Sequence, residues 1–190
     1  APPDQQMMVE HYLAPAEKVL VLPAGRPLEH LLMAQQLGTV IYACKRLPNL
    51  IGKDVVVIGQ GSAGLFFDAM CRRMGARQVI GVDNKPARVE AGLKFGATQT
   101  VNDADEKALH AVESLTAGNL ADVVIEAAGE DDSINLMPHL VKVGGHLLFF
   151  GVPRAYEFQF DFWTLFRKYC HTTSSGGTSL EPGAKSFRMA

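Results

Sequence analysis

The chain has 190 residues, of which 47% are hydrophobic and 20% are charged, and its formal net charge is −2. This composition is typical of a globular protein with a sizeable core, and the small net charge argues against a nucleic acid or a membrane surface bound through electrostatics. No apolar run reaches the length of a membrane span, and the first residues carry no signal-peptide pattern. We therefore expect a cytoplasmic protein.

The cysteines and histidines show no metal-binding pattern. Cys44, Cys71 and Cys170 are far apart in the sequence and form no C-x-x-C pair. Neither a zinc knuckle nor a disulfide framework is indicated, and free thiols in a reducing compartment are expected. The six histidines show no H-x-x-x-H spacing, so none of them is assigned to a metal.

Residues 1–25 do not look like the beginning of a compact domain. Short strands are predicted at residues 7–13 and 18–22. Because two isolated strands cannot bury their own apolar side chains, we expect them to pack against a neighbouring part of a larger protein. From residue 28 to residue 47 the apolar periodicity predicts one helix of about five turns.

Beyond this helix, short apolar runs alternate with longer amphipathic segments. The predicted strands are residues 55–59, 78–82, 98–101, 121–127, 146–150 and 171–175. The predicted helices are residues 62–74, 86–95, a segment capped by Asp103 or Asp105 that ends at 115, 133–140 and 160–169, with a final helical turn from residue 186. Such alternation predicts an α/β fold with a doubly wound parallel sheet, a six-stranded Rossmann fold with strand order 3-2-1-4-5-6.

A G-x-G-x-x-G motif follows the first of these strands directly and opens a helix. Gly59 permits a tight turn, Gly61 lets a pyrophosphate approach the backbone, and Gly64 lets the helix pack closely on the strand. The helix N-terminus, with Ser62 and Ala63, offers free N–H groups and a positive dipole end to phosphates. The motif in this context predicts a dinucleotide site.

The second strand of the unit ends in an acidic residue. Asp83 lies 19 residues after Gly64, where a carboxylate can accept hydrogen bonds from both ribose hydroxyls of an adenosine. The same carboxylate repels the 2′-phosphate of NADP, so NAD is favoured, although Lys85 and Arg88 are near enough to soften that preference. The alternative is an ordinary glycine turn with Asp83 as a solvated strand-end residue.

Three further residues allow both a functional and a structural interpretation. Glu126, at the end of a buried strand, could be a catalytic base, but a hydrogen-bonded structural role is favoured. His146 begins a strand and is more often a packed or surface histidine than a ligand. The aromatic residues around Trp163 have helical spacing, which is more typical of a core or a subunit contact than of a substrate pocket.

Taken together, six stretches are far more specific than the glycine motif alone. They are residues 27–30, 52–65, 79–96, 122–129, 144–153 and 186–190. On these stretches the chain resembles the cofactor-binding half of a medium-chain dehydrogenase/reductase, in the zinc-type alcohol and polyol dehydrogenase branch. The resemblance implies an oxidoreductase that transfers a hydride between a nicotinamide and the carbinol carbon of an alcohol or polyol.

The resemblance also implies cofactor contacts beyond the glycine loop. They are Asp83, Asn84 and Arg88 at the adenosine ribose, Ala127, Ala128 and Gly129 near the nicotinamide-side ribose, Phe150, Gly151 and Val152 beside the nicotinamide, and Thr173 and Ser175 as further backbone contacts. Relatives pair two sheets through the last edge strand, so a homodimer is expected near residues 171–175. No residue of this chain is expected to be catalytic or to bind a metal.

In full-length relatives, a GroES-like N-terminal domain carries the catalytic zinc ligands, and this pattern is absent from the sequence. Residues 1–25 are therefore expected to be a remnant of that domain with a linker, and residues 26–190 an NAD-binding domain that is truncated at its C-terminus. Zinc is expected only through the absent domain. The isolated chain is expected to bind NAD without dehydrogenase turnover.

One departure from the family pattern leaves alternatives open. Polyol-type relatives usually have Ala-Glu-Pro-Leu at positions 34–37, where the Glu can reach the zinc, but this chain has Gln35, a poor ligand. A zinc-independent quinone or enoyl reductase of the same superfamily is one alternative, although such relatives usually take NADPH and Asp83 argues for NADH. A non-catalytic dinucleotide-sensing module is the other.

Overall fold

The computed structural model describes residues 10–16, 19–103, 106–176 and 185–190. The chain divides into two compact units, Ala1–Met33 and Ala34–Ala190. The strands expected at 7–13 and 18–22 are wrong where they can be checked, because residues 10–13 and 19–22 form no strand; residues 7–9 and 18 lie outside the described part. Leu13 and Val21 are 94% and 86% exposed, so neither segment has a surface that would hold it as a strand.

The single helix expected over residues 28–47 is also wrong. The structure has two helices, α1 (Leu28–Leu32) in the first unit and α2 (Ala34–Cys44) in the second. Helix α1 buries none of its residues, whereas α2 buries six. Periodicity therefore predicted helical propensity correctly, but packing decides where the helix is continuous.

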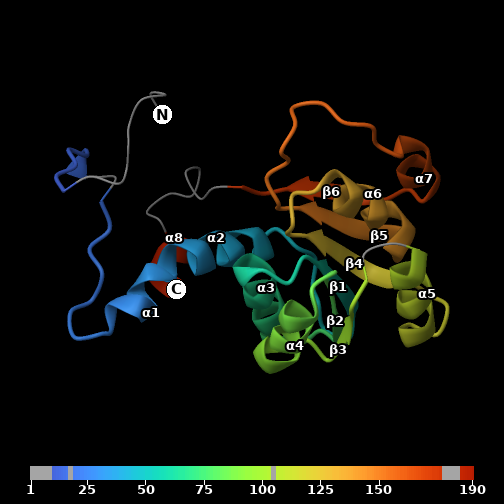
Figure 1. Ribbon diagram of the computed structural model, residues 1–190, viewed down its shortest axis with the longest axis horizontal. Coiled ribbons are helices and arrows are strands. Elements are labelled where there is room, and N and C mark those ends of the chain that lie inside the picture. The colour runs from blue at the N-terminus through green and yellow to red at the C-terminus, as the bar shows by residue number, and fades with distance from the viewer. Residues whose placement is uncertain (1–9, 17–18, 104–105, 177–184) are drawn as a thin grey trace. The chain divides into compact units, whose positions relative to one another are not determined.

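The second unit is built on the predicted six-stranded parallel sheet, with strand order β3-β2-β1-β4-β5-β6 (Figure 1). The strands are β1 (Asp54–Ile58), β2 (Gln78–Val82), β3 (Gln99–Val101), β4 (Ala121–Glu126), β5 (Val141–Phe149) and β6 (His171–Ser174). The helices that follow α2 are α3 (Ser62–Arg73), α4 (Pro86–Phe95), α5 (Glu106–Leu115), α6 (Asp131–Leu140), α7 (Phe162–Arg167) and α8 (Lys185–Met189). The predicted doubly wound Rossmann fold is confirmed, and the switch in strand order lies between β1 and β4.

Strand β5 begins earlier than the sequence predicted. The strand was expected over residues 146–150, but β5 already starts at Val141. Its register against β4 shifts between the pairs Ala121–Val141 and Val123–His146. The intervening residues form an irregularity in which Gly144 takes φ +71°, so the glycines bend the strand rather than interrupt it.

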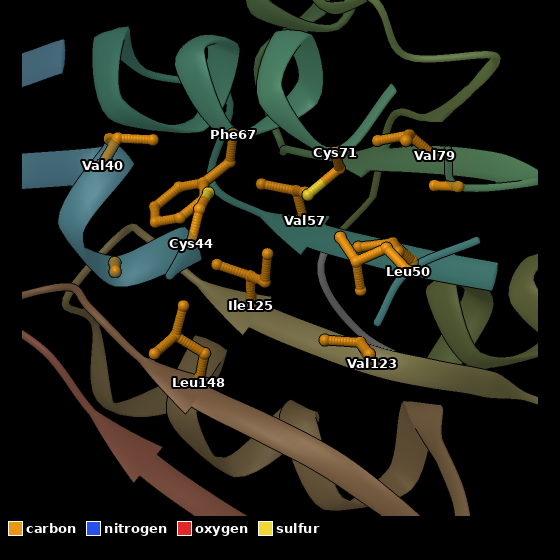
Figure 2. Packing of buried hydrophobic residues seen from close by; sticks show 13 residues of the cluster. Val40, Cys44, Leu50, Val57, Phe67, Cys71, Val79, Val123, Ile125 and Leu148 are labelled. Atoms are coloured by element: carbon orange, nitrogen blue, oxygen red, sulfur yellow. The ribbon is translucent and has the colours of Figure 1, made fainter. Parts of the chain in front are cut away.

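The core lies on both faces of the sheet because successive side chains of each strand point to opposite sides. Val57 packs with Phe67 of α3 and Val40 of α2 on one face, as Figure 2 shows. Val56 packs with Met137 of α6 on the other face. Every residue of β1 is buried, which explains why its sequence is a nearly continuous apolar run.

Helices α2 and α8 also meet, although they are far apart in the sequence. The Lys45 Nζ donates a hydrogen bond to Ser186 Oγ at 2.9 Å. The ring of Phe187 occupies the space that a Cβ at Gly38 would need, which gives this helical glycine a packing reason.

Among the described residues, no helix is long and apolar enough to cross a membrane.

A carboxyl group is enclosed within this fold. Asp68 of α3 is fully buried, and burial raises the pKa of its carboxyl to about 8, although the neighbouring Gln60 amide opposes part of the rise. The ordinary pKa of the group is 3.8, so between about pH 4 and pH 8 the folded protein holds a proton that the unfolded chain releases. Stability is therefore full at low pH and falls as the pH rises through this window.

We expect the substitution Asp68→Asn to flatten this dependence. The free energy of unfolding of the unaltered protein should decrease from pH 5 to pH 8 by roughly 1 kcal/mol per pH unit more than that of D68N. Urea unfolding at several pH values measures the difference, with Glu90→Gln on the exposed face of α4 as a control that keeps the slope. Parallel pH profiles for D68N and the unaltered protein would contradict the assignment.

Candidate functional site

A cleft of about 850 Å³ lies where β1, β2 and β4 reach their carboxyl ends, at the switch in strand order. Ligands of open α/β sheets bind at this place. Most of the residues that line the cleft come from these strand ends, the segments after them and helix α2, whereas Asp103 follows β3 and Arg154 follows β5. They are Gln36, Ile58, Gly59, Gly61, Ser62, Ala63, Val82, Asp83, Asn84, Lys85, Arg88, Asp103, Ala127, Ala128, Glu130, Asp132, Ser133 and Arg154.

The three glycines of the motif meet three different constraints. Gly59 leaves β1 with φ +90°, and a Cβ there would lie 2.8 Å from the main-chain N of Ala128. A Cβ at Gly64 would overlap the carbonyl oxygen of Gly59, so helix α3 packs directly on the loop. A Cβ at Gly61 would meet no protein atom within 4 Å. The protein itself does not need a glycine at position 61, and the open space there faces the cleft.

Asp83 lies at the end of β2, and main-chain groups hold its side chain. Its Oδ2 accepts a hydrogen bond from the N–H of Gln60 at 2.8 Å, and its Oδ1 accepts one from the N–H of Lys85 at 2.9 Å. The Arg88 Nη1 is 3.5 Å from Oδ2. A carboxylate has about four acceptor positions, and the two main-chain N–H groups occupy two of them.

The turn after β4 is held by Glu126, which is fully buried. Its Oε1 accepts hydrogen bonds from the N–H groups of Ala128 and Gly129 at 2.7 and 2.8 Å and from the hydroxyl of Ser133 at 2.7 Å. The predicted structural role of Glu126 is confirmed by these contacts. The side chain does not line the cleft, so it shapes the turn from within.

Other residues expected at the site do not line the cleft. Gly64, Gly129, Phe150, Gly151, Val152, Thr173 and Ser175 are not among the lining residues. Phe150 packs edge-on against Phe67, with 4.9 Å between ring centroids. Thr173 pairs in register with Leu148, and the Ser175 N–H donates to Phe149 O at 2.9 Å, so both belong to the β5–β6 edge. Cofactor contacts at these positions stay predictions.

Several polar residues of the cleft were not predicted from the sequence. Glu130, Asp132 and Ser133 follow the β4 turn at the start of α6, and the strand-end rule could have found them. Arg154, after β5, forms an ion pair with Glu130 at 2.6 Å. Gln36 reaches the cleft from α2. Gln35, the departure from the family pattern, is exposed and does not line the cleft. No local sequence signal points to Gln36 or Arg154, because the fold alone brings them there.

The described residues do not fit a zinc ion. Within residues 10–16, 19–103, 106–176 and 185–190, no group of three His, Cys, Asp or Glu side chains could hold a metal. Cys44 and Cys71 lie in the core cluster of Figure 2, and burial raises the pKa of both thiols, that of Cys44 to about 12. They behave as apolar core residues rather than as thiolate ligands.

The chain is similar to known dehydrogenases. The model of a family described as zinc-binding dehydrogenase matches residues 63–186. Sorbitol dehydrogenase 1 of Saccharomyces cerevisiae is 33% identical over 161 residues, which cover 82% of this chain and 45% of that protein. Sorbitol dehydrogenase of Bacillus subtilis is 27% identical over 192 residues, covering 96% of this chain and 54% of that protein.

Solved structures give the same result for the fold. An alcohol dehydrogenase from Thermotoga maritima superposes with a TM-score of 0.75 at 27% identity, over 88% of this chain and 48% of that chain. This chain spans about half the length of the curated relatives it matches.

The glycine constraints give a pair of contrasting stability predictions. Gly61→Ala should change the free energy of unfolding by no more than about 1 kcal/mol, because its Cβ enters open space at an extended backbone position. Gly64→Ala should cost about 3 kcal/mol, because its Cβ meets main-chain atoms that cannot move aside easily. Thermal or urea unfolding of both variants measures the contrast. Equal losses in the two variants would contradict the described loop geometry.

Proposed function

The chain belongs to the zinc-binding dehydrogenase family, and on this premise we propose that its cleft binds NAD as the cofactor-binding part of an alcohol or polyol dehydrogenase. The observation that carries the proposal is the position of Asp83, which lies in the cleft and is hydrogen-bonded to the glycine loop at Gln60. In one contact, the carboxylate that would bind a ribose is joined to the loop that would bind a pyrophosphate.

The glycine loop supports the pyrophosphate half of the proposal. Space is open at the Cβ position of Gly61, and Ser62 and Ala63 begin the 12-residue helix α3 at the floor of the cleft. A helix N-terminus presents N–H groups and a partial positive charge, which suits a pyrophosphate. In this proposal Gly61, Ser62 and Ala63 bind the phosphates, and Gly59 and Gly64 hold the loop in shape.

The preference for NAD over NADP is proposed from charge. The Asp83 carboxylate would repel a 2′-phosphate, and Arg88, which could otherwise attract one, is 3.5 Å from that same carboxylate. Lys85 lines the cleft beside them and would weaken the discrimination without reversing it. Asn84 completes the proposed adenosine end.

The nicotinamide supplies the hydride chemistry when it is bound, and the chain binds and orients the cofactor. We propose that Ala127, Ala128 and Gly129 pass near the nicotinamide-side ribose, and that residues 150–152, 173 and 175 provide main-chain contacts towards the ring. Glu126 fixes the first of these segments through its hydrogen bonds to Ala128 and Gly129. The chain by itself is proposed to bind the cofactor without turnover, since its described residues offer no zinc site.

A polyol or a simple alcohol is the proposed substrate class of the parent enzyme. The support comes from relatives named sorbitol dehydrogenase, D-xylulose reductase and alcohol dehydrogenase. A homodimer through β6 is proposed as well. β6 is the last strand of the sheet order and pairs with β5 on one side, and an edge strand offers main-chain groups to a second copy.

We expect NADH to bind the chain saturably and more tightly than NADPH. Trp163 is the only tryptophan, so energy transfer from its fluorescence to the reduced nicotinamide reports binding. Asp83→Asn should weaken NADH about tenfold, because hydrogen bonds to a charged group are lost, and should bring NADPH to equal or tighter binding. Parallel titrations of the unaltered chain and D83N with both dinucleotides measure the change.

A control variant tests whether any cleft carboxylate has this effect. Asp103 also lines the cleft and forms an ion pair with Lys107 at 3.6 Å. Asp103→Asn should leave the ratio of NADH to NADPH affinity nearly unchanged. Tighter binding of NADPH than of NADH by the unaltered chain would refute the proposed NAD preference, and binding of neither would refute the cofactor site.

A further inference from the structure

Glu126 accepts hydrogen bonds from two segments of the proposed nicotinamide end. Its side-chain Oε1 accepts three hydrogen bonds, from Ala128, Gly129 and Ser133. Its main-chain oxygen accepts two more, from the N–H groups of Phe150 and Gly151, each at 3.0 Å. One residue at the end of β4 therefore ties the turn after β4 to the loop after β5.

The second carboxylate oxygen of Glu126 is placed differently. Oε2 is buried and has no hydrogen-bond partner within the described part of the chain. It lies against Gly151, where a Cβ would come within 2.5 Å of it. A Cβ at Gly129 would in turn overlap the carbonyl oxygen of Val152. The backbone of both segments thus packs against the Glu126 carboxylate. Its Oε1 accepts three hydrogen bonds, whereas its Oε2 is buried without a donor.

Arg154, one of the cations that line the cleft, is already engaged. Arg154, on the loop after β5, pairs with Glu130 at 2.6 Å. Glu130 N–H donates to Ser133 Oγ at 3.3 Å, so the hydroxyl of Ser133 links the start of α6 to Glu126. The donors to the Glu126 carboxylate are two main-chain N–H groups and one hydroxyl, all neutral, and the residue is fully buried, where the field of a charge is weakly screened.

We propose that Glu126 is a positioning residue whose buried charge favours the oxidised cofactor over the reduced one. The inference rests on the proposed function, because it needs the nicotinamide at the segments that Glu126 holds. The nicotinamide ring carries a positive charge when oxidised and none when reduced. A negative charge near the bound ring would stabilise NAD⁺ selectively and so would lower the reduction potential of the bound cofactor.

The direct test is Glu126→Gln, which keeps an acceptor oxygen for the three donors and removes the charge. Calorimetric titration gives the dissociation constants of NAD⁺ and NADH for the unaltered chain and for E126Q. We expect the dissociation constant of NAD⁺ divided by that of NADH to rise about tenfold in E126Q. This is the effect of removing a unit charge roughly 10 Å from the ring at an effective dielectric of about 20. Loss of packing or geometry alone would weaken both ligands together and leave the ratio unchanged.

Asp122→Asn is the matched control, because it removes the same charge from the other end of β4, where Asp122 Oδ1 is 3.3 Å from Lys53 Nζ. Its ratio should stay at the unaltered value. Ser133→Ala provides a second test should E126Q not fold, because it removes one donor and keeps the carboxyl group. Because a hydrogen bond to a carboxylate stabilises its charged form, loss of this donor weakens the negative charge at Glu126, and the ratio should rise.

The outcomes separate the inference from the proposed function. Binding of both ligands with an unchanged ratio in E126Q, or an equal shift in D122N, overturns the inference alone. A fall of the ratio in S133A, or an unchanged ratio, likewise overturns it. If the unaltered chain binds neither NAD⁺ nor NADH, the proposed function fails and the inference fails with it.

Discussion

The hydrogen bond from the Gln60 N–H to the Asp83 carboxylate joins the carboxyl ends of β1 and β2, with 2.8 Å between nitrogen and oxygen. The rest of the site depends on this contact, because it fixes the glycine loop relative to the acidic residue across the cleft. Both residues are buried, so the bond is protected from competition with water. The cleft is therefore shaped before any ligand arrives, which limits the ordering that binding requires.

The side chain of Gln60 supports the same loop from below. It is only 1% exposed, and its Nε2 donates to Val57 O at 3.2 Å. A Cβ at Gly81 would lie 2.7 Å from its Oε1, and one at Gly92 would overlap that atom, so two neighbouring elements leave room for the amide. Gln60 stands at a position that the glycine motif leaves unspecified, yet its side chain contacts β1, β2 and α4 and lies beside the buried Asp68.

The sequence predicted the sheet well because buried parallel strands are short apolar runs bounded by glycine or proline. It failed where packing or long-range contacts decide the outcome. Residues 28–47 carry a helical pattern, yet the helix is interrupted, and the glycines at 144–145 bend a strand that a local analysis took to begin later. In the cleft, Asp83 could be predicted from its distance to the glycine motif. Arg154 and Gln36 could not, since only the tertiary fold brings them to it.

We propose that the open position at Gly61 and the carboxylate of Asp83 bind one dinucleotide. The most direct test is a nitrogen–proton correlation spectrum of the isotope-labelled chain, recorded during addition of NADH. We expect the amide signals of Gly61, Ser62, Ala63 and Lys85 to move together along one saturable curve. Shifts confined to the separate pocket beside Asn135 and Asp161, or no shifts at all, would contradict it.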